Sequence, residues 1–180
     1  MWCVQTVDGE YRKRMYDILD LYANKNRQVH VIAIDEKPKQ IISEKRRPIP
    51  MKKDTANIFI AVKPRRGRRI ANVTERRAKR DFANLVKDIL DSYPEARKLL
   101  LVMNNLNTHF PGVITETFGE EKKKRMLSRL EFHYTPKHTS WLDIAEIEIN
   151  VINMEYIDRR FENLKELEQK VRTETLKRNH

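Results

Sequence analysis

Residues 99–109 read LLLVMNNLNTH, an apolar run that stops abruptly at a cluster of asparagine, threonine and histidine. An apolar run of this length, bounded by turn-forming residues, is typical of a strand covered on both faces of a sheet. Open α/β sheets bind ligands just beyond the carboxyl ends of such strands. The stretch therefore predicts a buried strand that ends at a functional site, although a simple asparagine-rich turn also fits the pattern.

A second apolar run, VHVIAIDEKP over residues 29–38, makes the same transition at Asp35. Proline lacks an N–H group and restricts the residue before it, so Pro38 predicts that this strand ends near Asp35 or Glu36. Asp35 would then end one strand as position 104 ends another.

A third stretch, TSWLDIAEIEIN over residues 139–150, mixes acids with apolar residues at helical spacing. Ser140 followed three residues later by Asp143 predicts a capping box that opens a helix. On this helix Asp143, Glu146 and Asn150 would share one face. If that face turns toward the strand ends, Glu146 meets Asp35 beside position 104.

The remaining patterns predict an α/β chain with a mixed sheet flanked by helices on both faces. Thr74 is the expected N-cap of a helix that Pro94 ends, and one short helix is expected within residues 110–128. The other expected elements are a helix over 8–23, a hairpin of strands 57–64 and 69–74 around Gly67, a strand over 130–136 and a last helix that opens at Asn163 with Leu164, Leu167, Val171 and Leu176 on one stripe.

Composition limits the class of protein. The 180 residues include a single cysteine, which excludes an internal disulfide framework and a cysteine-built zinc site. The length suits one domain, and no run approaches the ~20 apolar residues of a membrane span. We expect a cytoplasmic protein that does not enter membranes.

The net charge of +11 is concentrated in one part of the chain. Residues 44–80 contain 14 lysines and arginines against 3 acids, so the rest of the chain is neutral. A basic excess confined to one segment predicts a surface that binds a polyanion, although a merely solubilising face is the alternative.

Carboxylates gathered beside such a surface repel each other and the ligand unless cations lie between them. Oxygen ligands without sulfur or a histidine cluster select Mg²⁺ or Mn²⁺. The matching chemistry is phosphoryl transfer with two metal ions, which activate a water or 3′-hydroxyl and stabilise the leaving oxygen. The spacing of these carboxylates in the sequence is weak support for a two-metal site, because scattered carboxylates are common in proteins.

Several strings together resemble the catalytic domain of bacterial insertion-sequence transposases, in the mariner-related group of the DDE endonuclease superfamily. The resemblance runs from about Trp2 to Asn179. Its strings are IDEKPKQ (34–40), ANIFIAV (56–62), VTERRAKRDFANLVKDIL (73–90), LVMNNLNTH (101–109), FHYTPKHTSWLDIAEIEI (132–149) and IDRRFENLKELEQKV (157–171).

The resemblance implies a ribonuclease H-like fold, two Mg²⁺ or Mn²⁺ ions, and cleavage and transfer of DNA strands at the ends of a mobile element. It matches the first catalytic aspartate to Asp35 and the terminal glutamate to Glu146. The second aspartate of the family's DNLNTH motif falls on Asn104, which is uncharged. We therefore expect an inactive or impaired enzyme, and the sequence leaves both an engineered and a naturally decayed origin open.

The resemblance and the charge pattern also predict contacts with DNA, at the element ends and the target, and a homodimer that pairs two ends. Asn105 and His109 would support the site. The residues expected on DNA are Lys37, Arg65, Arg66, Arg68, Arg69, Arg76, Arg77, Lys137 and His138.

Transposases of this kind normally carry an N-terminal helix-turn-helix region, and nothing before Asp35 resembles one. We therefore expect residues 1–180 to form one isolated catalytic domain, acting on the bacterial nucleoid. Two alternatives stay open: a catalytically dead module that binds DNA or pairs with an active subunit, and a metal-dependent nuclease or integrase relative that does not transpose.

Overall fold

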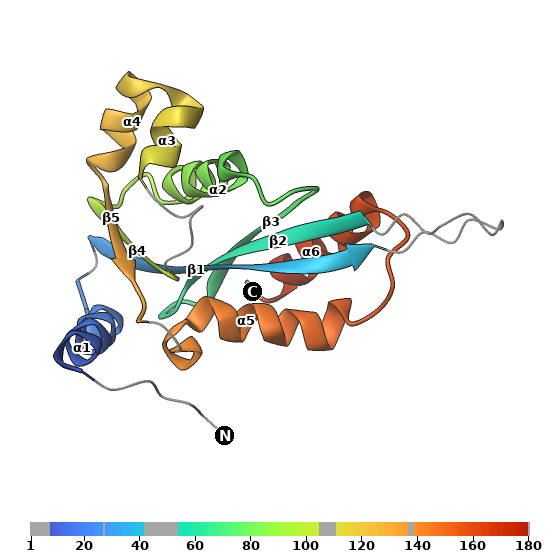
Figure 1. The fold of residues 1–180 in the computed structure, drawn as a ribbon, viewed down its shortest axis with the longest axis horizontal. Coiled ribbons are helices and arrows are strands. Elements are labelled where there is room, and N and C mark those ends of the chain that lie inside the picture. Colours follow the sequence, from blue (N-terminus) through green and yellow to red (C-terminus); the bar gives the residue numbers. More distant parts are fainter. Residues whose placement is uncertain (1–7, 27, 42–53, 105–110, 137–138, 180) are drawn as a thin grey trace.

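The computed structural model describes residues 8–26, 28–41, 54–104, 111–136 and 139–179. In these ranges five strands form one sheet in the order β3-β2-β1-β4-β5 (Figure 1). The strands are β1 (Val29–Ile41), β2 (Asp54–Lys63), β3 (Arg68–Thr74), β4 (Lys98–Met103) and β5 (Leu130–Tyr134). The predicted mixed sheet is confirmed.

The register of β1 places two sequence-distant residues side by side. β1 runs parallel to β4, with Ile34 opposite Met103, and β4 runs parallel to β5. β1 is antiparallel to β2, and β2 is antiparallel to β3. The residues that follow Ile34 and Met103 therefore emerge together at one edge of the sheet.

The predicted end of β1 near Asp35 is wrong, because the strand continues to Ile41 with Pro38 opposite Asn57. Pairing with β4 stops at Ile34, so the second half of β1 has a neighbouring strand on one side only. A proline is tolerated at such an edge, where no partner strand needs its missing N–H.

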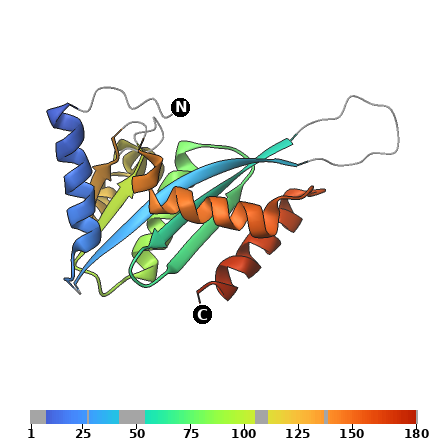
Figure 2. The same cartoon turned by 90° about the horizontal axis from the view of Figure 1, so that it is seen from below.

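Two layers of helices cover the sheet, as Figures 1 and 2 show. Successive strand residues face opposite layers, so Ile32 and Ile34 pack with α2 (Lys79–Ser92), whereas Ala33 packs with α5 (Ile144–Ile152). The α2 layer also holds α3 (Gly112–Phe118) and α4 (Glu120–Leu127); the α5 layer also holds a π-helical turn η2 (Asn153–Ile157), α6 (Leu164–Lys177) and α1 (Gly9–Ala23).

Two helix starts and one helix count differ from the sequence predictions. Thr74 ends β3 and caps no helix; α2 begins after Ala78, whose N–H donates to Asp81. Ser140 opens a 3₁₀ turn, η1 (Ser140–Leu142), and Asp143 is the N-cap of α5. The short helix expected within 110–128 is two helices, since Gly119 takes a positive φ of 79° between α3 and α4.

The hairpin and the terminal helices follow the sequence predictions closely. Gly67 adopts a φ of 62° in the turn between β2 and β3, a conformation that favours glycine. Asp8 and Asn163 cap α1 and α6. Leu176, however, is 53% exposed and lies off the buried stripe of α6. No helix in the described ranges is long and apolar enough to cross a membrane.

Candidate active site

Asp35 and Asn104 meet at the edge where β1 and β4 run parallel. The Asn104 Nδ2 donates a hydrogen bond of 3.2 Å to Oδ1 of Asp35, and the Asp35 residue is only 7% exposed. The parallel register creates this contact, since Ile34 and Met103, the preceding residues, are paired. The structure thus brings together two of the three residues predicted for the site.

Helix α5 packs on the face of β1 that carries Ala33 and, by strand alternation, Asp35 and Lys37. The Lys37 ammonium group donates a 2.7 Å hydrogen bond to Oδ1 of Asn150, which ties the strand to this helix. Glu146 lies in the first turn of α5. The predicted face of this helix is therefore turned toward the strand ends.

Asp143 is a third carboxyl group in this region and is 4% exposed. Its Oδ1 accepts hydrogen bonds from the backbone N–H groups of Ala145 and Glu146, at 3.0 and 3.3 Å. Burial, the nearby Asp35 carboxylate and, less strongly, Glu146 raise the pKa of Asp143 to about 8. Burial therefore disfavours the charged form of Asp143, and the carboxylates of Asp35 and Glu146 add to that effect.

Tyr22 extends the site toward α1. Its hydroxyl donates a 2.9 Å hydrogen bond to the backbone oxygen of Leu142. Burial and the neighbouring Asp143 raise the pKa of Tyr22 far above its usual range, so the phenol stays protonated. The sequence patterns gave no signal for this contact between residues 120 positions apart.

The donor atoms at this edge are oxygens, which suit a hard divalent cation, but they carry less negative charge than three carboxylates would. Asp35, Asn104 and Glu146 offer oxygen atoms, which Mg²⁺ and Mn²⁺ prefer. One of the three donors is an amide that already hydrogen-bonds Asp35. In the described ranges no three acidic, histidine or cysteine residues are arranged to hold a metal ion.

The family model for DDE superfamily endonucleases matches residues 21–168 of the chain. The chain belongs to this family. Among solved structures, the fold is similar to the Mos1 transposase in its paired-end complex with the left transposon end, with a TM-score of 0.63 at 10% identity. The match covers 98% of this chain and 57% of the transposase chain. No curated protein sequence matches. The fold of this DDE endonuclease chain is ribonuclease H-like, as the sequence resemblance implied.

In this DDE endonuclease the arginine-rich hairpin lies beside the amino end of β1, whereas Asp35 lies at the middle of that strand. Val62 pairs with Ala33, so the turn over 64–67 lies near the amino end of β1. At about 3.3 Å per residue, roughly 15–20 Å of strand separates the turn from Asp35. The hairpin arginines predicted to bind DNA therefore do not border the carboxyl groups.

Arg69 is engaged inside the protein. Its Nε and Nη2 lie 2.5 and 3.1 Å from the two carboxylate oxygens of Glu148, and each of these side chains is 12% exposed. Its Nη1 donates to the backbone oxygens of Gly67 and Arg178. This guanidinium group links β3, α5 and the C-terminal residues, so Arg69 is not available to DNA.

Other predicted DNA contacts lie nearer the carboxyl groups. Arg76 and Arg77 follow β3 at the end where Thr74 pairs with Asn57, which in turn pairs with Pro38. Arg77 forms an ion pair with the buried carboxylate of Glu36, on the opposite face of β1 from Asp35. Asn105, His109, Lys137 and His138 lie outside the described residues.

Proposed function

We propose that the chain is the catalytic domain of a DNA transposase that cleaves and joins DNA strands with divalent metal ions, and that Asn104 impairs it. The observation that carries the proposal is the contact between Asp35 and Asn104 at the ends of adjacent parallel strands, beside the helix of Glu146. The family match supports a nuclease of the DDE superfamily. A homodimer would pair two DNA ends, and residues 1–180 would form one catalytic domain.

Asp35, Asn104 and Glu146 would hold the ions. When bound, two Mg²⁺ or Mn²⁺ ions supply an activated water or 3′-hydroxyl and stabilise the leaving oxygen. Asn104 offers an amide in place of a carboxylate, so one of three anions is missing. Its N–H also occupies the Asp35 oxygen that faces it. Both effects lower metal affinity, and with it the rate of strand cleavage.

The same hydrogen bond favours a second candidate, a module that binds DNA or pairs with an active subunit without cleaving. Two adjacent carboxylates at positions 35 and 104 would repel each other when no cation lies between them. The amide replaces that repulsion with an attractive contact of 3.2 Å. A site built this way is stable without metal.

The substitution Asn104→Asp separates the two candidates. We expect the restored carboxylate to increase nicking of supercoiled plasmid in Mg²⁺ or Mn²⁺ by about a hundredfold or more, since a metal ion supplies several kcal/mol of transition-state stabilisation. Thermal unfolding gives an independent measurement. In EDTA the variant should unfold at a lower temperature than the parent. Added Mg²⁺ should raise the unfolding temperature of the variant more than that of the parent.

The matched control is Asn104→Asp combined with Glu146→Gln, which should bind DNA and leave plasmid uncut. If Asn104→Asp neither cleaves DNA nor gains thermal stability from Mg²⁺, the enzyme reading is wrong and the binding module stands. Cleavage by the double variant would remove Glu146 from the site.

A further inference from the structure

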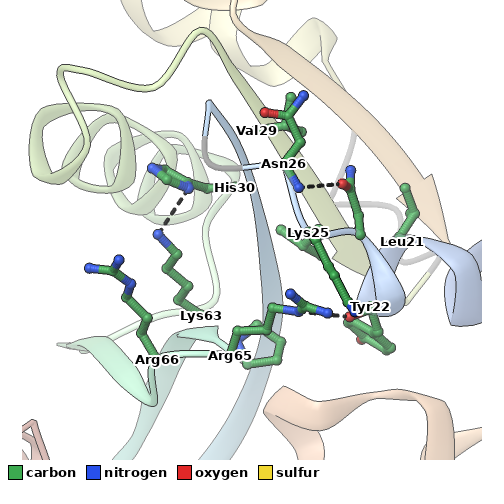
Figure 3. Close-up of a pocket in the computed structure, with 12 residues that line it drawn as sticks. Leu21, Tyr22, Lys25, Asn26, Val29, His30, Lys63, Arg65 and Arg66 are labelled. Carbon is green, nitrogen blue, oxygen red and sulfur yellow. Dashed lines mark hydrogen bonds between the residues drawn. The ribbon is translucent and has the colours of Figure 1, made fainter.

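A basic pocket lies at the hairpin end of the sheet, where Figure 3 shows His30, Lys63 and Arg66 near one another. His30 from β1, Lys63 from the end of β2 and Arg66 from the turn line two adjoining cavities of about 260 and 570 Å³. The larger cavity is also lined by Arg68 and Tyr93. We call this group of five residues the hairpin pocket.

The cations of the hairpin pocket are crowded together. Lys63 Nζ donates a 2.9 Å hydrogen bond to Nδ1 of His30 and lies 5.0 Å from the ring centre of Tyr93. Arg68 lies over the same ring at 5.3 Å. A histidine that accepts a hydrogen bond from an ammonium group is neutral, so these contacts hold Lys63 in place without neutralising its charge.

Acidic groups balance little of this charge. Glu95 is the nearest acid, with Oε1 3.5 Å from Nε2 of His30, and its side chain is 67% exposed. Burial and then the charge of Lys63 lower the pKa of His30, and burial, Arg66 and Arg68 lower the pKa of Lys63; Glu95 opposes both shifts without reversing them. Both shifts have the sign expected where positive charges repel each other, and a bound anion would relieve that repulsion.

Neighbouring arginines on the hairpin behave differently. Arg69 has Glu148 as an internal counterion, and Arg65 donates to the backbone oxygens of Tyr22 and Ala23. Across the described part of the chain, the exposed Arg66 side chain forms no ion pair or hydrogen bond. Arg66 and Arg68 are therefore available to a ligand from solution, whereas Arg69 is not.

We propose that the hairpin pocket is a second DNA-binding site, in which Lys63, Arg66 and Arg68 contact backbone phosphates well away from the catalytic edge. This inference rests on the proposed function, since it takes DNA as the substrate. The separation of roughly 15–20 Å from Asp35 corresponds to about five phosphates along one strand of a duplex. Two adjoining cavities that share three residues suit a run of phosphates better than one small anion.

The test compares Arg66→Gln/Arg68→Gln with Lys124→Gln/Arg125→Gln, which removes the same charge from exposed positions on α4. Binding of a fluorescein-labelled 30-base-pair duplex is followed by anisotropy over a series of salt concentrations, in EDTA. Each phosphate contact contributes about 0.9 to the slope of log affinity against log salt. For the hairpin variant, that slope should decrease by about 1.8 and the affinity should fall about tenfold or more. For the α4 variant, both changes should be much smaller.

A second measurement follows His30 by NMR across pH. Bound DNA should raise the pKa of His30 toward its ordinary value, because phosphates offset the charges of Lys63 and Arg66. Equal salt slopes for the two variants would overturn the proposal. So would a His30 signal that responds to 10 mM inorganic phosphate and not to DNA, which would mark a site for a free anion. Neither measurement uses metal or cleavage, so a failure of Asn104→Asp to nick DNA is a separate result.

Discussion

The carboxyl edge around Asp35 and the hairpin pocket carry side chains of opposite charge. At the carboxyl edge, Asp35 and Asp143 are almost fully buried; the Asn104 amide donates to Asp35, and burial and the Asp35 charge raise the pKa of Asp143. At the hairpin end, Arg66 and Arg68 are exposed, with the partly exposed Lys63 between the turn and His30. The first region gathers carboxyl groups, whereas the second gathers positive charges that an anion would offset. Under the two proposals above, metal ions would lie at the carboxyl edge and DNA phosphates at the hairpin pocket.

Helix α5 links the two ends, because its acids point in different directions. Glu146 is in the first turn beside Asp143, whereas Glu148 lies about 200° around the helix and meets Arg69 and Arg178. Burial alone would raise the pKa of Glu148, but hydrogen bonds from the two arginines outweigh it and lower the pKa. Among the hairpin arginines, Arg69 is thus held by α5 through its ion pair with Glu148.

The largest effect on stability should come from Glu148→Gln. The change leaves two guanidinium groups partly buried with no carboxylate between them, which we expect to cost about 2–4 kcal/mol of unfolding free energy. Urea unfolding measures this loss. Glu131→Gln is the control, because the Glu131 side chain is 55% exposed and its contact with His133 should contribute less than about 1 kcal/mol. Equal losses for the two variants would show that Arg69 needs no counterion.

Asp143→Asn should give the next largest effect, with a sign that depends on pH. The folded-state pKa is about 8 against an ordinary 3.8, so the folded protein binds the proton more tightly than the unfolded chain. Stability from this group is therefore present at low pH and is lost as pH rises from about 4 to 8. Asparagine keeps the N-cap without the charge.

We expect the Asp143→Asn variant to match the parent near pH 4 and to exceed it by about 1–3 kcal/mol at pH 9, a fraction of the full shift at ~1.4 kcal/mol per unit. Urea unfolding across this pH range measures the difference. Asp8→Asn makes the same exchange at the exposed cap of α1 and is the control. A difference that stays constant with pH would show that the carboxyl edge imposes no electrostatic strain on Asp143.

The sequence predicted most of the sheet and the core. The run LLLVMN ends as β4 at Met103, and the hairpin turns at Gly67, because burial pattern and turn chemistry are local signals. The length of β1 was not predicted. Pro38 is tolerated in this strand because β4 ends beside Ile34. The sequence of β1 alone does not show where the neighbouring strand β4 ends. The sequence predicted Ser140 as the N-cap of α5, but the N-cap is Asp143, because the 3₁₀ turn η1 precedes the helix.

The family motif located two residues that the structure brings into contact, but no sequence pattern predicted which arginines pair inside the protein. The contact of Asp35 with Asn104 follows from the motif and the parallel register. The internal role of Arg69 depends on Glu148, 79 residues away, and no local pattern distinguishes it from Arg66. A run of arginines in sequence therefore predicts a basic hairpin but not which guanidinium groups face solvent.

Arg65→Gln should have the smallest effect and sharpens the difference among the hairpin arginines. Helix α1 has no basic residue in its last turn, and Arg65 Nη2 donates a 2.9 Å hydrogen bond to the backbone oxygen of Ala23 there. A cation at a helix C-terminus typically contributes about 0.3–1 kcal/mol, so the variant should lose that much in urea unfolding. Arg66→Gln, the matched control, should keep its stability and lose about 0.9 from the salt slope of DNA binding. The reverse outcome, with stability lost at Arg66 and the salt slope lost at Arg65, would mean that Arg65 is the residue facing DNA and that the hairpin pocket is wrongly placed.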